Sequence, residues 1–244
     1  MTKLFGIKSL LDQIKFDKEH ISVVHLFKDN KKLINELKSN NIKVKIHHDK
    51  KWFSQFDKNL NHQFVVTEVQ NKNKVETLEL FLETIKNKTK SIILIIDSIQ
   101  DPFNFGSILR TCDAFGVDAV IYKNDNQVQI NDFVSKTSMG AINTLNIFKV
   151  INLSRTIELL KKYDYWIYAS MLNRKAKSND DVDYSDKSVI IVGNEQSGIN
   201  KLTAKNSDQL IMINMYGKLQ SLNVAVATGI LLYEARNKIF KNKK

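Results

Sequence analysis

The sequence predicts an α/β fold in which helices cover both faces of a mostly parallel sheet, preceded by a smaller α/β unit. Helix and strand patterns alternate along the chain, and the strand pattern at 91–97, SIILIID, is continuously apolar. Such a run is typical of a parallel strand that is covered on both faces. A polar break, NKNK at 71–74, separates the two parts. We therefore expect domains at 1–70 and 91–244, joined by a linker over 71–90.

The smaller unit is predicted from short apolar runs and one amphipathic segment. Residues 30–39 place Leu33, Ile34 and Leu37 on one helical face. The pattern predicts strands at 21–27, 42–47 and 63–69, and helical segments at 30–39 and 50–57.

The larger unit continues the alternation after 91–97. The pattern predicts further strands at 118–122, 146–150, 165–170, 188–192 and 209–213, and helices within 74–88 and at 104–115, 154–163 and 221–240. In open parallel sheets, ligands bind beyond the carboxyl ends of the strands. The unusual residues of this chain fall at such ends, in 104–110, 193–198 and 217–223, so we expect a functional site there.

Composition narrows the classes of function. The chain has 37 basic and 26 acidic residues, a net charge of +11, which favours polyanionic partners such as nucleic acid. Because 33 of the 37 cations are lysine and asparagine is abundant, the charge can also reflect an AT-rich genome. A single cysteine, the absence of a long apolar run and the absence of a signal-peptide pattern indicate a cytoplasmic protein without a membrane segment.

All five histidines precede residue 63. The larger unit therefore cannot build a histidine-based triad or a His/Cys zinc site, and we expect no metal. Any chemistry there relies on Asn, Ser, Glu, Arg and backbone groups.

Three segments of the larger unit could carry that chemistry. The first, DPFNFGSILRTCDAFG at 101–116, holds the only proline, the only cysteine and one of four arginines; Asn104 can cap its helix, and Cys112 is expected to be buried within it. The second, IIVGNEQSGI at 190–199, places glycines at a strand end. In the third, INMYGKLQSLNVAVATGILLYEA at 213–235, Ser221 or Asn223 can cap an apolar helix.

Together and in this order, these segments resemble the SpoU-type ribose methyltransferases of the SPOUT class. Near the start, FGIKSLLD, VVHLFKD and KVKIHHDKKWFS resemble the substrate-binding domain of bacterial 23S ribosomal RNA guanosine-2′-O-methyltransferases. The resemblance covers nearly the whole chain. It implies a C-terminal trefoil knot, S-adenosylmethionine as cofactor, ribosomal RNA as substrate and a homodimer.

The resemblance also implies roles for single residues. The family's cofactor contacts fall on Gly193, Ile213, Leu222 and Ser170, and its catalytic set falls on Arg110, Asn104, Glu195, Ser221 and Asn223. Asn214 stands where the family usually has proline, which puts the cofactor affinity in doubt. The expected reaction moves a methyl group from a sulfonium to the ribose 2′-oxygen of a guanosine, with Arg110 holding a phosphate or stabilising the developing oxyanion.

The first domain is expected to contact RNA. Its first 70 residues hold 13 lysines and 8 acids, and the candidate contacts are Lys31, Lys32, Lys43, Lys45, Lys50 and Lys51. Two alternatives stay open: a transfer-RNA 2′-O-ribose methyltransferase of the same class, and a non-catalytic RNA-binding or ribosome-assembly protein on this scaffold.

Overall fold

A computed structural model describes residues 2–57, 61–70, 77–194, 197–218 and 221–241 of the chain. The contacts divide the chain into two compact units, one of residues 1–74 and 130–144, the other of residues 75–129 and 145–244. Helices α5 (Asp132–Thr137) and α6 (Ala141–Thr144) thus belong to the first unit, although the prediction placed 130–144 in the second domain. The physical reason is local: Ser135 Oγ donates to the Lys3 carbonyl at 2.6 Å, and Phe133 packs against aromatic residues of the first unit.

The first unit contains a four-stranded sheet in the order β1-β4-β2-β3; β2 and β3 pair in parallel, and the other described pairs are antiparallel. Its elements are β1 (Thr2–Phe5), α1 (Ile7–Asp17), a 3-10 turn (Lys18–His20), β2 (Ile21–Phe27), α2 (Lys31–Ser39), β3 (Val44–His47), a 3-10 helix (Lys50–Gln55) and β4 (Val65–Val69). Leu10 of α1 and Leu37 of α2 bury against Val24, Leu26 and Val65, so both helices cover one face. The sequence patterns did not reveal β1 or α1; the four residues of β1 are too few to show an alternation.

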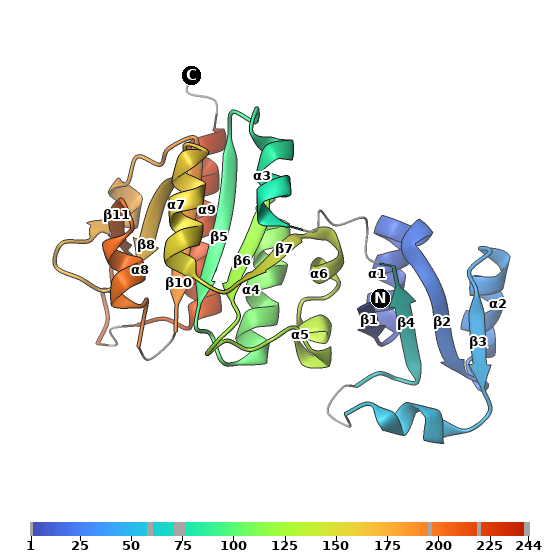
Figure 1. Cartoon of the computed structure of the whole chain (residues 1–244). Coiled ribbons are helices and arrows are strands. Elements are labelled where there is room, and N and C mark those ends of the chain that lie inside the picture. The colour runs from blue at the N-terminus through green and yellow to red at the C-terminus, as the bar shows by residue number, and fades with distance from the viewer. Residues whose placement is uncertain (1, 58–60, 71–76, 195–196, 219–220, 242–244) are drawn as a thin grey trace. The chain divides into compact units, whose positions relative to one another are not determined.

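The second unit is a seven-stranded sheet in the order β7-β6-β5-β10-β8-β11-β9, with every described pair parallel (Figure 1). Its strands are β5 (Ser91–Asp97), β6 (Ala119–Lys123), β7 (Asn146–Val150), β8 (Trp166–Ser170), β9 (Lys177–Ser178), β10 (Lys187–Gly193) and β11 (Gln209–Met212). All seven residues of β5 are buried, as its apolar run predicts.

Helices cover both faces of this sheet. They are α3 (Leu78–Ile85), α4 (Pro102–Ala114), α7 (Leu153–Lys162), α8 (Lys201–Lys205) and α9 (Val224–Phe240), with a 3-10 turn at Asn179–Asp181. Leu78 and Phe81 of α3 share a buried cluster with Ile157 of α7 and Ile93 of β5, while α4 and α9 contact each other and α9 contacts β10. The range expected to be a linker, 71–90, thus contains a helix whose apolar side chains are buried in the second unit.

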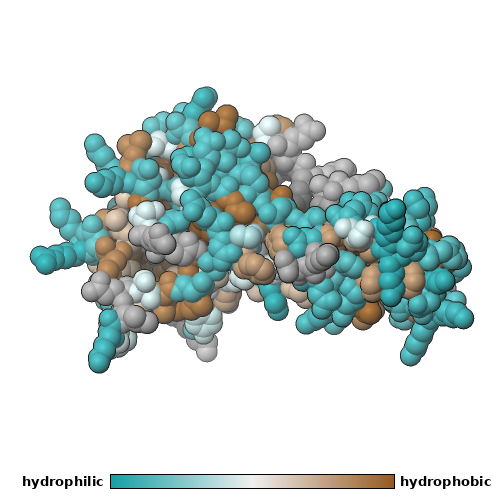
Figure 2. Space-filling model, turned by 90° about the horizontal axis from the view of Figure 1, so that it is seen from below, coloured by the Kyte–Doolittle hydropathy of each residue, from teal (hydrophilic) through white to brown (hydrophobic). Residues whose placement is uncertain are grey.

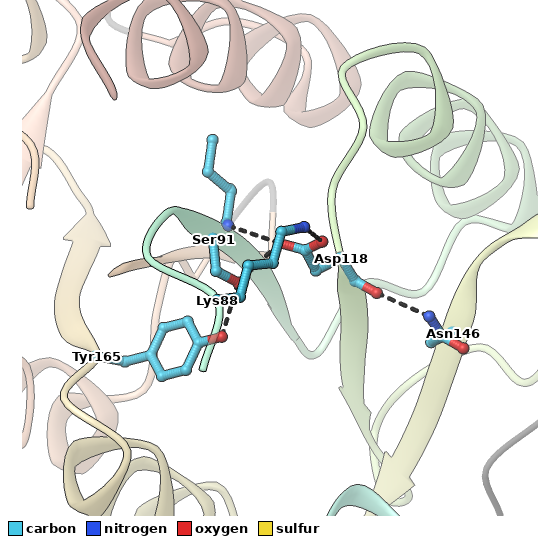
Figure 3. A network of polar contacts seen from close by, with 6 residues as sticks. Lys88, Ser91, Asp118, Asn146 and Tyr165 are labelled. Carbon is cyan, nitrogen blue, oxygen red and sulfur yellow. Dashed lines mark hydrogen bonds and ion pairs between the residues drawn. The ribbon is translucent and has the colours of Figure 1, made fainter. Parts of the chain in front are cut away.

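A network of polar side chains closes the amino ends of these strands (Figure 3). Asp118, just before β6, forms an ion pair with Lys88 and accepts hydrogen bonds from Ser91 Oγ at 2.7 Å and from the Ile92 N–H at 3.2 Å. Ser91 Oγ also bonds the hydroxyl of Tyr165 at 2.7 Å. Asn146 Nδ2 donates to the Asp118 carbonyl at 3.0 Å. The network ties together the starts of β5, β6, β7 and β8.

Candidate functional site

A cavity of about 460 Å³ opens at the other edge of the sheet, where β8, β10 and β11 end. Figure 2 looks toward these carboxyl ends from below, and apolar surface lies there among polar side chains of the second unit. Residues from four segments line the cavity: Ser170, Met171, Leu172, Val192, Gly193, Asn194, Ser197, Gly198, Ile199, Met212, Ile213, Met215, Ser221, Leu222, Val224 and Ala227. The structure therefore brings together the four residues matched to the cofactor and one of the catalytic candidates, Ser221.

The turn after β10 requires glycine at two positions. A Cβ on Gly193 would lie 2.4 Å from the carbonyl carbon of Gly198, and Gly198 itself has φ +67°. Asn194 and Gly198 exchange two backbone hydrogen bonds, of 3.0 and 2.9 Å, so the chain folds back on itself here. Glu195, the catalytic candidate in this turn, lies outside the described residues.

Asn223 joins the start of α9 to α4. Its Oδ1 accepts from the N–H groups of Ala225 and Val226 at 2.9 and 3.3 Å, which caps the helix, and its Nδ2 donates to Asn104 Oδ1 at 2.9 Å. The expectation that Asn104 caps α4 is wrong: the cap is Asp101, whose side chain accepts from the Phe103 N–H at 2.9 Å, and Pro102 follows at the first helical position. Asn104 therefore lies within the first turn of α4 and orients Asn223.

Arg110 lies apart from the cavity lining. It is exposed on α4, and within the described part of the chain its guanidinium makes no hydrogen bond or ion pair. On the same helix Cys112 is completely buried, and burial raises the pKa of its thiol. The cysteine is therefore an inert core residue, as expected.

Asn214 shows how this chain restrains the loop where proline is usual in the resembling family. Its side-chain Nδ2 donates to Ser178 Oγ at 2.7 Å, which links the loop after β11 to the end of β9. The neighbours of Asn214 on either side, Ile213 and Met215, line the cavity. A side-chain hydrogen bond thus restrains the segment without the fixed φ of a proline ring.

The cavity is electrically neutral as far as it is described, since none of its described lining residues is charged. Three methionine thioethers, several aliphatic side chains, two glycines and the hydroxyls of Ser170, Ser197 and Ser221 face it. Among the described residues, no group of three or more His, Cys, Asp or Glu side chains is placed to hold a metal ion. The lining suits a largely apolar ligand with a few hydrogen-bonding groups.

Comparison with known proteins decides the family. The model of the SpoU rRNA Methylase family matches residues 91–233 of this chain. The chain belongs to the SpoU rRNA methylase family. The prediction of a SpoU-class RNA methyltransferase, made from the three segments, is thereby confirmed.

Two relatives match this SpoU methyltransferase along almost their whole length. An uncharacterized tRNA/rRNA methyltransferase of Mycoplasma genitalium is 41% identical over 236 residues, 96% of this chain and 96% of that protein. The 23S rRNA (guanosine-2′-O-)-methyltransferase RlmB of Pectobacterium atrosepticum is 32% identical over 241 residues, 95% of this chain and 96% of that protein. Both matches include the first unit as well as the second.

Solved structures show the same fold. The SpoU methyltransferase AviRb of Streptomyces viridochromogenes, in complex with AdoMet, has a TM-score of 0.77 at 18% identity, over 97% of this chain and 89% of that chain. The TrmH/SpoU tRNA modifying enzyme of A. aeolicus has a TM-score of 0.56 at 34% identity, over 66% of this chain and 81% of that chain. The prediction of an α/β fold with a mostly parallel sheet is confirmed.

The six lysines expected to contact RNA are exposed but do not share one element. Lys31 and Lys32 begin α2, Lys43 precedes β3, Lys45 lies within it, and Lys50 and Lys51 begin the 3-10 helix. Lys50 Nζ lies 5.0 Å from the ring centre of Phe64 and 5.3 Å from that of Phe27.

Sequence reasoning missed an aromatic layer on the second face of the first sheet. His25 Nδ1 and His47 Nε2 are 2.9 Å apart, and the Trp52 ring stacks over both imidazoles at 4.3 and 4.1 Å. Desolvation lowers the pKa of both histidines, so both favour the neutral form. Strand parity could have found the layer, because His25 lies between the buried Val24 and Leu26 on β2, and His47 follows the partly buried Ile46 on β3.

No helix in the described part of the chain is both long and apolar enough to span a membrane.

Proposed function

We propose that this SpoU methyltransferase transfers a methyl group from S-adenosylmethionine to the ribose 2′-oxygen of a guanosine in 23S ribosomal RNA. One observation carries the proposal: the four residues matched to the cofactor, together with Ser221, line a single cavity at the carboxyl edge of the sheet. The ribosomal substrate is supported by the RlmB relative, whose similarity extends over both units of this chain.

The cavity fits the proposed cofactor in size and chemistry. Its volume of about 460 Å³ falls within the range of small-molecule sites. Leu172, Ile199 and Met212 offer apolar contact to a flat base, and Gly193 contributes to the cavity wall at the end of β10. A sulfonium meets no like charge among the described lining residues. The bound cofactor supplies an electrophilic methyl group.

The chain's own residues then align the acceptor. Asn223 caps the start of α9 and also bonds Asn104 of α4. These two contacts restrain the chain directly after Ser221 and Leu222, which line the cavity. Holding the acceptor oxygen and the methyl carbon in line removes much of the entropic barrier. A guanidinium offers five N–H donors and no acceptor, so the exposed Arg110 is suited to bind an RNA phosphate bidentately beside the reacting ribose.

The same proposal includes a homodimer and a trefoil knot at the C-terminal stretch. Helix α9 leaves Val226 52% exposed and Tyr233 57% exposed, with Ile230 of the helix and Leu222 just before it also exposed. Such an apolar row in water is stabilised when a second copy covers it. Light scattering of the active protein checks the dimer, because a fully active monomer at micromolar concentration contradicts it.

The first unit is proposed to deliver the RNA, leaving cofactor binding to the second. Its six exposed candidate lysines support phosphate contacts, and every cofactor-matched residue lies after residue 169. Replacing Lys45 and Lys50 together by Ala should weaken RNA binding and leave cofactor affinity unchanged.

Transfer RNA is the second candidate substrate, favoured by the relative named as a tRNA/rRNA methyltransferase and by the likeness to a tRNA modifying enzyme. The deciding experiment offers labelled S-adenosylmethionine with 23S rRNA and with total tRNA, then maps methylated ribose by mass spectrometry. We expect 2′-O-methylguanosine in 23S rRNA. Label in tRNA alone selects the alternative, and cofactor binding without transfer to either RNA selects a non-catalytic RNA-binding role.

A further inference from the structure

The loop that follows β11 carries a fully exposed aromatic side chain beside the cavity. Ile213 and Met215 line the cavity, and Tyr216, the next residue, is 92% exposed, more than any other large apolar or aromatic side chain described. Within the described part of the chain its ring makes no aromatic contact and its hydroxyl no hydrogen bond. An aromatic ring left in water at the edge of a functional cavity is a candidate contact for a ligand.

Contacts with the second unit restrain this loop, so the Tyr216 ring is carried by an ordered segment. Asn214 donates to Ser178 Oγ at 2.7 Å, and Ile213 and Met215 are part of the cavity wall. Tyr216 is thus preceded by three consecutive residues that are each engaged with the second unit. A ring presented by an ordered segment loses little conformational freedom when a ligand stacks on it.

A second loop emerges beside the first one. Residues 171–176 follow β8, which pairs in parallel with β11, and the Met171 N–H donates to the Ile211 carbonyl at 3.0 Å. After this loop the chain returns to the sheet as β9, where Lys177 pairs in register with Ile211 of β11. The two loops therefore leave the same edge of the sheet, next to each other.

The chemistry of the two loops is apolar and basic at once. Leu172 lines the cavity and is 64% exposed. The loops contribute three exposed cations, Arg174, Lys175 and Lys218, and Lys177 at the start of β9 adds a fourth; neither 171–177 nor 213–218 contains an acidic residue. Arg174 is one of only four arginines in the chain. An aromatic face among cations is the chemistry that binds unpaired nucleotides, by base stacking and phosphate contact.

We propose that Tyr216, Leu172 and the cations of these two loops form a binding site for one unpaired nucleotide of the RNA, adjacent in the strand to the nucleotide that is methylated. The base stacks on Tyr216, and Arg174 and Lys218 contact the flanking phosphates. Stacking at this place holds the strand so that the neighbouring ribose lies over the cavity. This inference rests on the proposed function in that the ligand is the RNA substrate.

The test measures RNA binding separately from methyl transfer. Tyr216→Ala, Tyr216→Phe and Tyr216→Trp are compared with wild type, using fluorescence anisotropy with a labelled single-stranded ribosomal RNA fragment, calorimetric binding of S-adenosylmethionine, and single-turnover transfer at increasing RNA concentration. We expect Tyr216→Ala to weaken RNA binding about 10- to 100-fold. The affinity for S-adenosylmethionine should change less than about twofold, and Phe and Trp should restore RNA binding.

A control variant and a second variant of the proposed site complete the test. Trp166→Ala removes an exposed aromatic ring at the amino end of β8, the opposite edge of the same sheet, and should leave RNA binding unchanged. Arg174→Ala should lower the slope of log affinity against log salt concentration by about 0.7, the value for one phosphate contact in single strands.

Equal RNA affinity of Tyr216→Ala and wild type overturns the site, as does an equal loss in Trp166→Ala. Failure of Tyr216→Phe to restore binding overturns the stacking role. Failure of the proposed function has a different signature, because wild type itself would then transfer no methyl group to RNA.

Discussion

The two edges of the seven-stranded sheet use polar side chains in opposite ways. At the amino edge, Lys88, Ser91, Asp118 and Tyr165 bond one another in a closed network (Figure 3). At the carboxyl edge, Ser170 and Ser221 border an open cavity and Tyr216 projects into solvent. The strands of this sheet thus begin in a region whose polar groups bond one another and end, at the other edge, in a region whose polar groups face a cavity or solvent.

The difference has a physical origin in the connections. Loops at the amino edge need only hold the strands together, and buried polar groups there must find partners within the protein. Loops at the carboxyl edge follow parallel strands and precede helices, so their side chains and N–H groups converge on one place. We therefore expect substitutions at the amino edge to change stability and substitutions around the cavity at the carboxyl edge to change activity.

The largest effect is expected from Arg110→Lys. A planar guanidinium binds two phosphate oxygens at once, whereas an ammonium does not. The loss of such a transition-state contact is worth ~3 kcal/mol, about two orders of magnitude in rate. Single-turnover transfer of labelled methyl to a ribosomal RNA fragment measures it, alongside calorimetric cofactor binding, which should be unchanged. Arg155→Lys, on the exposed surface of α7, is the matched control; near-normal transfer by Arg110→Lys contradicts the assigned role.

Asp118→Ala tests the closed edge. The substitution removes the ion pair with Lys88 and leaves Ser91 Oγ and the Ile92 N–H without this acceptor. We expect the free energy of unfolding in urea to fall by about 2–3 kcal/mol, while transfer by the folded protein is unchanged. Glu83→Ala, which removes an exposed pair with Lys86 and a hydrogen bond from the Tyr163 hydroxyl, should cost less stability than Asp118→Ala. A loss of activity without a loss of stability in Asp118→Ala would contradict the assignment of a purely structural role to the amino edge.

Asn223→Ala should affect both properties, because its side chain caps α9 and also orients the site. Loss of the cap is expected to lower the free energy of unfolding by about 1–2 kcal/mol. Asn223→Asp retains the capping oxygen and lacks the amide that donates to Asn104. Unfolding in urea should therefore show most of the stability restored in Asn223→Asp, while methyl transfer stays reduced. Full activity in Asn223→Asp would show that the Asn104 bond has no part in positioning the site.

The smallest effect concerns Tyr165 and pH. Burial raises the pKa of Tyr165 to about 12, with the hydrogen bond between Tyr165 and Ser91 opposing the rise and the charge of Asp118 adding to it. A tyrosine in the unfolded chain has a pKa of about 10, so the folded state holds this proton more tightly. That stability is intact below pH 10 and declines as the pH rises toward 12.

Tyr165→Phe should accordingly lower the free energy of unfolding by about 1 kcal/mol at pH 8, from the lost hydrogen bond to Ser91. Between pH 10 and pH 12 the variant should lose less stability than wild type. Urea midpoints at pH 8 and pH 11 measure both effects. Parallel losses in the two proteins would mean that Tyr165 does not titrate as its burial implies.

Much of the site was predictable from three short segments. Gly193 ends β10, Ile213 follows β11 and Leu222 precedes α9. The family resemblance pointed to these three residues, and the rule that parallel strands end at one edge predicted a site there. The helix cap at Asp101 was missed because Asp101 and Asn104 are both good capping residues, and only the backbone path decides between them. The bond between Asn214 and Ser178 joins residues far apart in the chain and has no local signature.

The sequence by itself determined the α/β class, the fully buried strand at 91–97 and the family, because periodicity, burial and motif spacing are properties of neighbouring residues. Tertiary structure alone decided that β10 lies between β5 and β8, that residues 130–144 join the first unit, and that Asn104 meets Asn223. These features depend on contacts between residues separated by tens of positions. Their energies arise only when the distant segments bury surface or share a hydrogen bond, and no local pattern records which partner a segment will find.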